Sequence, residues 1–448
     1  MPRFTSSFAR ALRTSLLASL LALFAIAHAQ PTEIQMWYAL TGALGEHTLE
    51  QVEDFNASQD QYRVVADFSG TYDETMVAAI AAFRAGTAPH IVQMFEVGTA
   101  TMMYAEGAIK PVHELFAETG VPFDPDVFLP AVRGYYSLPD GRMMSMPFNS
   151  STAVMWVNDD ALEAAGIDPA TVSLETWEEV REVARQVVDE GGADCGFSMA
   201  WPTWTQFEQF SAVHDIPLAS LSNGLEGLGA EMLIDSDLHV QHVQNLIDMS
   251  AEGSFMYGGR GNAGDTLFVS GECAIVQGSS ALIARVNREA EFDWTMHMLP
   301  YYEGTPNAPL NSIIGGASFW VMQSPERTDE EWAGVAEFFS FLSTVEQARK
   351  WHVNTGYLPI RFGIYEELEA EGFYAENPGL DIPYLQLTRG EATANSSGLR
   401  LGNMPQIRAI IEEEFELALN GQQSAQRAMD NAVERSNVVL RAFQRANQ

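Results

Sequence analysis

The amino-acid sequence predicts an α/β protein of two lobes with a binding cleft between them. The chain has 448 residues, which is more than one hydrophobic core usually organises. Strand-like and helix-like segments alternate, and two long extended runs are suited to crossing from one lobe to the other. Ligands of such proteins bind at the carboxyl ends of the strands, so we expect the site in the cleft.

The first part of the chain alternates strands and helices. Met76, Ile80 and Phe83 recur at the spacing of one helix face, and a glycine and a proline at 86–89 end that helix. The expected elements are strand 34–38, helix 46–55, strand 62–68, helix 73–85 and strand 90–95. This alternation is typical of a largely parallel sheet.

The extended runs 144–158 and 294–321 are each longer than one strand requires, and they define the expected lobes. We assign 30–146 plus 311–358 to lobe 1 and 147–310 plus 359–448 to lobe 2. Further helices are expected at 174–190 with Ser173 as the cap, 240–252, 330–342, 344–352, 404–419 and 425–446.

The first 29 residues have the features of a secretory signal peptide. Three arginines precede the apolar run 16–26, and Ala27, His28 and Ala29 form a small-x-small exit. We expect cleavage after Ala29 and a soluble periplasmic protein. No later segment reaches the roughly 18 apolar residues that a membrane span needs.

The charge and the cysteine content exclude a nucleic-acid-binding protein and a disulfide-rich scaffold. The chain carries 24 Lys+Arg against 60 Asp+Glu, a net charge of −36, which excludes a nucleic-acid partner. The two cysteines, Cys195 and Cys273, are too few for a disulfide framework. They either form one bridge or are two small buried side chains, and the sequence leaves both open.

No catalytic or cofactor motif is present. The chain lacks the serine-hydrolase elbow, the phosphate-binding P-loop and the zinc-protease motif. His239 and His242 stand three apart in a helical stretch, but no third metal ligand is recognisable, so an exposed helix face is the favoured interpretation. We therefore expect a binding protein without a cofactor or metal, and not an enzyme.

Several polar segments suit the binding of an anion. Hydroxyl and amide groups gather at 148–152 and 277–280, and glycines at 314–318 allow a ligand close to the backbone. Arg400 lies in a glycine-flanked loop before a helix, and a guanidinium can bind a phosphate with two parallel hydrogen bonds. Trp201 and Trp204 either stack on a polyol or form a buried pair.

The resemblance to a known family is carried by longer strings, of which three include the segments at 148–152, 314–318 and Arg400. The strings are IAAFRAGTAPHIVQ, EVGTATMM, PFNSST, IIGGAS, TGYLPI, GFYAENPG and GLRLGNMPQIR. Over nearly the whole mature chain, the sequence resembles the glycerol 3-phosphate-binding proteins of Ugp-type ABC importers, in the maltose-binding-like group of solute-binding proteins. The resemblance implies the two-lobed periplasmic binding protein fold with its ligand in the interlobe cleft.

The resemblance also implies the site and the partners. The implied phosphate contacts are Ser151, Ser279, Gly316, Tyr357 and Arg400, and the implied glycerol contacts are Tyr72, Glu96, Trp201 and Trp204. A monomer would capture glycerol 3-phosphate or glycerophosphodiesters and deliver them to an ABC permease and, through it, to the ATPase.

Two departures from the family pattern, Tyr38 and Gly278, bear on fine specificity. The alternatives are a receptor for neutral oligosaccharides of the maltose-like group and an exported phosphodiesterase. The oligosaccharide receptor would have more aromatic residues in its pocket and no arginine directed at phosphate.

Overall fold

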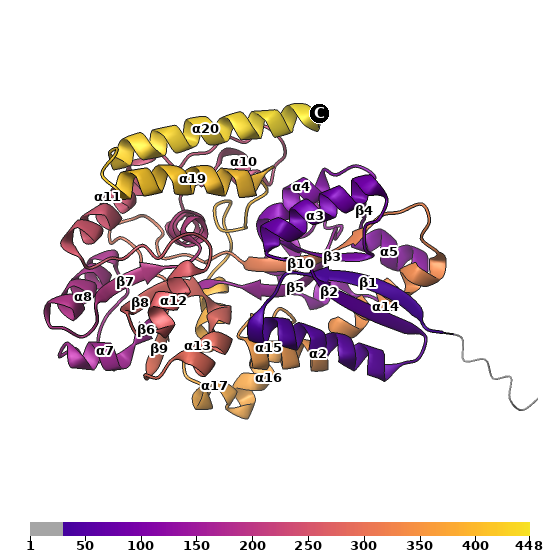
Figure 1. Cartoon of the computed structure of the whole chain (residues 1–448), viewed down its shortest axis with the longest axis horizontal. Coiled ribbons are helices and arrows are strands. Elements are labelled where there is room, and N and C mark those ends of the chain that lie inside the picture. Colours follow the sequence, from indigo (N-terminus) through magenta and orange to yellow (C-terminus); the bar gives the residue numbers. More distant parts are fainter. Residues whose placement is uncertain (1–29) are drawn as a thin grey trace, which may run out of the picture.

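The computed structural model describes residues 30–448 and contains two separate β-sheets, each flanked by helices (Figure 1). The predicted signal peptide at 1–29 lies outside the described residues. Within 30–448, no helix combines the length and the apolar character that crossing a bilayer requires. The predicted α/β class is confirmed by this arrangement.

The first sheet combines parallel and antiparallel strands in the order β2-β1-β3-β10-β4, with β5 also paired to β10. Its strands are β1 Thr32–Tyr38, β2 Tyr62–Phe68, β3 Ile91–Phe95, β4 Ile109–Lys110, β5 Met146–Ser151 and β10 Gly315–Met322. β1 is parallel to β2 and β3, as the alternating pattern predicts, whereas β10 runs antiparallel to β3, β4 and β5. The antiparallel strand comes from the second extended run, which re-enters this sheet.

The second sheet has the order β7-β8-β6-β9. Its strands are β6 Ala153–Asn158, β7 Cys195–Met199, β8 Cys273–Ser279 and β9 Trp294–His297. β7 and β8 are parallel, while β6 runs antiparallel to both β8 and β9. The run 144–158 therefore supplies one strand to each sheet, and the chain crosses at Thr152, slightly beyond the expected boundary at 146/147.

Helices cover both sheets; each expected range contains a helix, and the shorter helices between them were not predicted. Around the first sheet lie α2 Gly42–Ser58, α3 Tyr72–Ala85, α4 Thr99–Met103, α5 Val112–Thr119, α6 Pro130–Tyr135, α14 Asp329–Leu342 and α15 Val345–Thr355. The others are α7 Asp159–Ala164, α8 Trp177–Asp189, α9 Gln209–Val213, α10 Ser220–Asn223, α11 Asp237–Glu252, α12 Ala263–Val269, α13 Ile283–Glu289, α16 Ile364–Glu371, α17 Phe373–Glu376, α18 Ile382–Leu387, α19 Met404–Leu419 and α20 Ala425–Ala446.

One predicted cap is wrong. Helix α8 begins at Trp177, and its N-terminal cap is Thr176 instead of Ser173. The Thr176 side chain accepts a hydrogen bond from the Glu179 amide, and Glu179 reaches back to the Thr176 amide. This reciprocal capping box satisfies two otherwise unpaired donors, and it therefore determines where the helix starts.

Cys195 and Cys273 form a disulfide, which decides the question that the sequence left open. They are paired positions at the starts of the parallel strands β7 and β8. The bridge closes a loop with a sequence separation of 78. In the chain-entropy account, closing a loop of this length restricts the unfolded chain.

Replacing both cysteines with alanine is therefore expected to lower the free energy of unfolding by about 2–5 kcal/mol. Urea unfolding of the wild type and the double variant measures the difference. Equal midpoints for oxidised and reduced wild-type protein would show that the bridge does not contribute.

His239 and His242 are buried, so the expectation of an exposed helix face is wrong. Each is 1% exposed, and they pack beside His214 and the ring of Phe210. His239 contacts the hydroxyls of Ser211 and Ser236. No group of three metal-ligating side chains occurs among the residues described here.

Burial lowers the pKa of His214 to about 4 and that of His239 to about 3. In the unfolded chain these rings bind protons near pH 6.5, so between pH 6.5 and 4 the unfolded state binds more protons than the folded state. The stability that neutral histidines contribute is thus present above pH 6.5 and is lost as pH falls. As pH falls through that window, we expect proton uptake by each ring in the unfolded chain to lower the free energy of unfolding by up to about 1.4 kcal/mol per pH unit. Asp265 and Glu412, whose pKa values burial raises to about 7, titrate in the same window with the opposite sign, so the test compares the wild type with His239→Asn. Urea unfolding at pH 7 and pH 5 measures both proteins, and an unchanged pH dependence in the variant would contradict the expectation.

Candidate ligand-binding site

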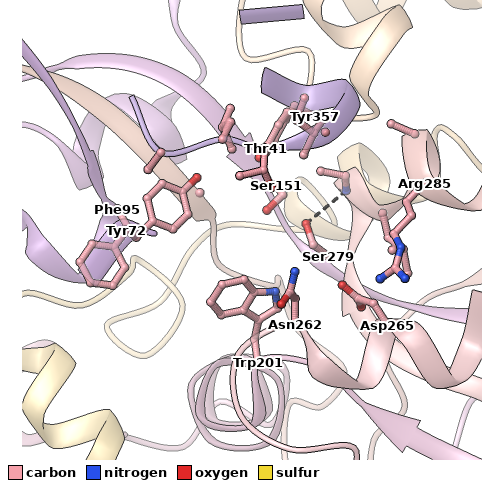
Figure 2. Close-up of a pocket in the computed structure, with 18 of the residues that line it drawn as sticks. Thr41, Tyr72, Phe95, Ser151, Trp201, Asn262, Asp265, Ser279, Arg285 and Tyr357 are labelled. Carbon is pink, nitrogen blue, oxygen red and sulfur yellow. Dashed lines mark hydrogen bonds between the residues drawn. The ribbon is translucent and has the colours of Figure 1, made fainter. Parts of the chain in front are cut away.

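A cavity of about 470 Å³ lies between the two sheets. Its walls include the loop at 39–44, the start of α3, the end of β3, and parts of α12, α13 and α19. Eight of the nine residues expected at the site line it, namely Tyr72, Glu96, Ser151, Trp201, Trp204, Ser279, Gly316 and Tyr357. Figure 2 shows Tyr72 and Phe95 on one side, Ser151 and Ser279 in the middle, and Asp265 and Arg285 on the other side.

The crossings between the sheets bring the central donors together. Ser151, at the end of β5, pairs with Gly315 at the start of β10. Ser279, at the end of β8, pairs with Ala153, just past the crossing at Thr152. Another crossing adds Tyr357, because the Leu358 amide donates to the Ser150 carbonyl at 2.7 Å. Segments distant in sequence thus converge on one point of the cleft.

Gly316 has a conformation and a location that exclude a side chain. Its φ is +98°, in the region that glycine occupies freely. A Cβ at this position would stand 1.8 Å from the Asn149 carbonyl oxygen. At Gly315, a Cβ would stand 2.4 Å from the Trp204 ring. The two glycines therefore let the β10 backbone and the indole approach the cleft closely.

A chain of buried hydrogen bonds orients Tyr72. The Ala39 amide donates to Gln93, Gln93 donates to Asn149, and Asn149 donates to the Tyr72 hydroxyl at 2.9 Å. The Tyr72 ring also stacks on Phe95, with centroids 5.5 Å apart. The Tyr72 hydroxyl also interacts with the hydroxyl of Tyr357, so both of these residues are held together on the wall of the cavity.

The two tryptophans line the cavity on an unusual backbone. Trp201 has a φ of +52°, which is uncommon for a large side chain. Trp204 begins a π-helical turn, Trp204–Glu208, and its indole N–H is buried without a partner among residues 30–448. Irregular backbone of this kind concentrates at functional sites. The indole N–H is a donor that a bound ligand would satisfy.

Arg408, on α19, is the cavity's most deeply buried cation. Its Nε and Nη2 donate to both oxygens of Glu208, and Nη2 also donates to Glu96 at 2.6 Å. Burial opposes its charge, but Glu208 and Glu96 outweigh burial and raise the pKa of Arg408. Its hydrogen bonds to the described residues use Nε and Nη2, which leaves Nη1 for a ligand.

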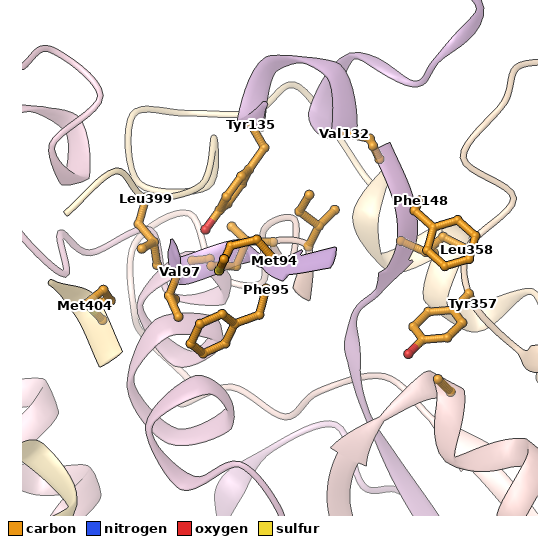
Figure 3. Packing of buried hydrophobic residues seen from close by; sticks show 14 of the residues in the cluster. Met94, Phe95, Val97, Val132, Tyr135, Phe148, Tyr357, Leu358, Leu399 and Met404 are labelled. Atoms are coloured by element: carbon orange, nitrogen blue, oxygen red, sulfur yellow. The ribbon is translucent and has the colours of Figure 1, made fainter. Parts of the chain in front are cut away.

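Arg400 is not among the residues that line the cavity, contrary to expectation. Its Nη2 donates to the carbonyl oxygens of Tyr135 at 3.2 Å and Ser137 at 2.7 Å. Leu399 and Tyr135 belong to the same apolar cluster, which holds this loop against the end of α6 (Figure 3). In this structure Arg400 therefore joins two loops, and the sequence interpretation selected the wrong arginine of GLRLGNMPQIR as the cation of the cavity.

The sequence did contain a signal for Arg408. It lies on the helix face formed by the buried Met404, Ile411 and Phe415, at steps of four, three and four residues. A single cation on an apolar helix face must find partners inside the protein. The polar residues of the wall that were not predicted from the sequence include Asn262, Asp265, Arg285 and Arg288. They belong to α12 and α13, or directly precede α12, and the apolar pattern of the sequence did not define these two short helices.

Comparisons with known proteins identify relatives that are solute-binding proteins, as a cavity between two sheets would suit. The family model described as bacterial extracellular solute-binding protein matches residues 50–381. The chain is 44% identical over 419 residues to the sn-glycerol-3-phosphate-binding periplasmic protein UgpB of Rhizobium meliloti (strain 1021), covering 94% of this chain and 96% of that protein. It is 43% identical to the UgpB protein of Yersinia pseudotuberculosis serotype I (strain IP32953), covering 93% and 94%.

Solved structures share the fold at low sequence identity. UgpB from Mycobacterium tuberculosis in complex with glycerophosphocholine has a TM-score of 0.75 at 18% identity, covering 93% of this chain and 99% of that one. The cyclic α-maltosyl-1,6-maltose binding protein from Arthrobacter globiformis has a TM-score of 0.71 at 19% identity, covering 92% and 99%. The expected resemblance, the maltose-binding-like fold and the expectation of a binding protein are confirmed. The chain belongs to the bacterial extracellular solute-binding protein family.

Proposed function

We propose that this protein captures glycerol 3-phosphate, or a glycerophosphodiester, in the cavity and delivers it to the permease of an ABC importer. The main support for this proposal is the distribution of hydrogen-bond donors and acceptors along the cavity. Ser151, Ser279 and the indole N–H of Trp204 are neutral donors suited to a phosphate, and Glu96 is an acceptor suited to glycerol hydroxyls. The relatives named for glycerol 3-phosphate support the same ligand.

Arg408 replaces Arg400 in the proposed ligand contacts. Its remaining nitrogen, Nη1, supplies a charged hydrogen bond, which is stronger than a neutral one. Seven of the other expected residues keep their proposed roles, and Trp204 moves from the glycerol contacts to the phosphate contacts. In this scheme the lobes close over the ligand, because contacts made from both sides of the cleft favour the closed state.

The location and assembly of the protein are part of the proposal. We propose export to the periplasm, cleavage after Ala29, a monomer, and lobes divided near the crossings described above. The closed form would dock on the permease, which couples it to the ATPase. Sedimentation of the purified protein tests the monomer, and amino-terminal sequencing tests the cleavage site.

Calorimetry with glycerol 3-phosphate, glycerophosphocholine, maltose and free glycerol tests the ligand. We expect a micromolar dissociation constant for the phosphoesters, corresponding to about −8 kcal/mol, and no heat of binding with maltose. Free glycerol should bind far more weakly because it lacks the phosphate. Binding of maltose without binding of either phosphoester would favour the oligosaccharide alternative and overturn the proposal.

A further inference from the structure

One wall of the cavity contains a buried carboxylate that the proposed contacts do not use. Asp265, in α12, is 6% exposed and lines the cavity. Its Oδ1 is buried without a hydrogen-bond partner among the described residues. A buried carboxylate without a partner is unfavourable by several kcal/mol, so native proteins rarely contain one. Its location in a ligand cavity suggests that a ligand supplies the missing donor.

The nearby cations are already engaged elsewhere. Arg285 donates from Nε to Glu289 at 2.6 Å and from Nη1 and Nη2 to the Thr266 hydroxyl. Arg288 donates to Glu289 at 3.0 Å. Burial raises the pKa of Asp265 to about 7, although the charge of Arg285 opposes the shift. Asp265 thus lacks the direct ion pair that would hold it ionised.

Gly278 makes room for this carboxylate. A Cβ on residue 278 would stand 3.1 Å from the Asp265 Oδ1, closer than such atoms usually approach. Gly278 is one of the two departures from the family pattern noted in the sequence. It precedes Ser279, a proposed phosphate contact, so Asp265 lies next to the phosphate end. Figure 2 shows Ser279 between Tyr72 and Asp265.

We propose that Asp265 binds a positively charged, hydrogen-bond-donating head group attached to the phosphate. The preferred ligand is then a glycerophosphodiester with a primary amine, such as glycerophosphoethanolamine. The glycerol would lie at Tyr72 and Glu96, the phosphate at Ser151 and Ser279, and the ammonium at Asp265. This inference rests on the proposed function and names the ligand subclass.

The test is calorimetry of the wild type and Asp265→Asn with glycerol 3-phosphate, glycerophosphoethanolamine and glycerophosphocholine. Choline has no N–H to donate, so the wild type should bind the ethanolamine diester at least tenfold more tightly than the choline diester. A charged hydrogen bond is worth roughly tenfold or more in affinity. Asp265→Asn should remove that preference and leave affinity for glycerol 3-phosphate unchanged or stronger.

Two further variants separate this role from a structural one. Glu272→Gln removes an equal charge from an exposed turn before β8, and we expect it to keep the ethanolamine preference. Gly278→Ala crowds Oδ1, and we expect it to reduce the preference while retaining glycerol 3-phosphate. Equal loss of all three ligands in Asp265→Asn, or no preference for ethanolamine in the wild type, would overturn the inference. Failure of the wild type to bind any phosphoester would instead refute the proposed function.

Discussion

Replacing Arg408 with alanine is expected to weaken the binding of glycerol 3-phosphate by at least about thirtyfold. The change removes the buried guanidinium whose Nη1 is the proposed phosphate contact, and truncating one member of a buried charge pair costs about 2–5 kcal/mol. It also leaves Glu96 and Glu208 buried without their cation, at 6% and 1% side-chain exposure. Calorimetry measures the affinity, and thermal unfolding measures the accompanying loss of stability.

Two companion variants make this result interpretable. Arg408→Lys keeps a charge that pairs with the carboxylates, so it should fold, yet it loses the fork of parallel donors and should still bind weakly. Arg400→Gln is the matched control in the neighbouring loop. It should lower stability, because Arg400 bonds to the carbonyls of residues 135 and 137, and it should change affinity less than threefold. A larger loss of affinity in Arg400→Gln than in Arg408→Lys would contradict our assignment.

Replacing Gly316 with alanine should abolish measurable binding and destabilise the protein. The added Cβ would stand 1.8 Å from the Asn149 carbonyl oxygen, so β10 and β5 would have to separate. The φ of +98° adds strain of roughly 1–3 kcal/mol. Because β5 and β10 carry Ser151 and the glycines of the cleft, their displacement would also move the phosphate donors. Calorimetry and urea unfolding measure the two effects.

Gly86→Ala is the control for backbone strain alone. Gly86 ends α3 with a φ of +72°, and a Cβ there meets nothing within 4 Å. We expect a loss of about 1 kcal/mol of stability and unchanged affinity. Similar losses of affinity in both variants would show that steric contact at Gly316 is not what shapes the cleft.

Periodic apolar patterns made most of the fold predictable. α19 and α20 span the predicted residues, and β2 does too, because apolar spacing and glycine or proline punctuation mark their ends. The cap of α8 was missed because Ser173 and Thr176 are both good caps. What selects Thr176 is the glutamate three residues later, which completes the reciprocal hydrogen bonds.

The site was less predictable than the fold because its residues come from distant segments. Strings shared with the family identified Ser151 and Gly316 as cleft residues, but the string GLRLGNMPQIR could not separate Arg400 from Arg408. That distinction depends on which helix face is buried, and therefore on tertiary packing. His239 and His242 illustrate the same limit, since their burial follows from the aromatic cluster around Phe210.

A crystal structure of the protein with bound glycerol 3-phosphate tests the central claim most directly. We predict phosphate oxygens within hydrogen-bonding distance of Ser151, Ser279 and Arg408 Nη1, and glycerol hydroxyls at Glu96 and Tyr72. A phosphate bound at Arg400, or at the outer Arg285 and Arg288 with the central donors empty, would contradict it.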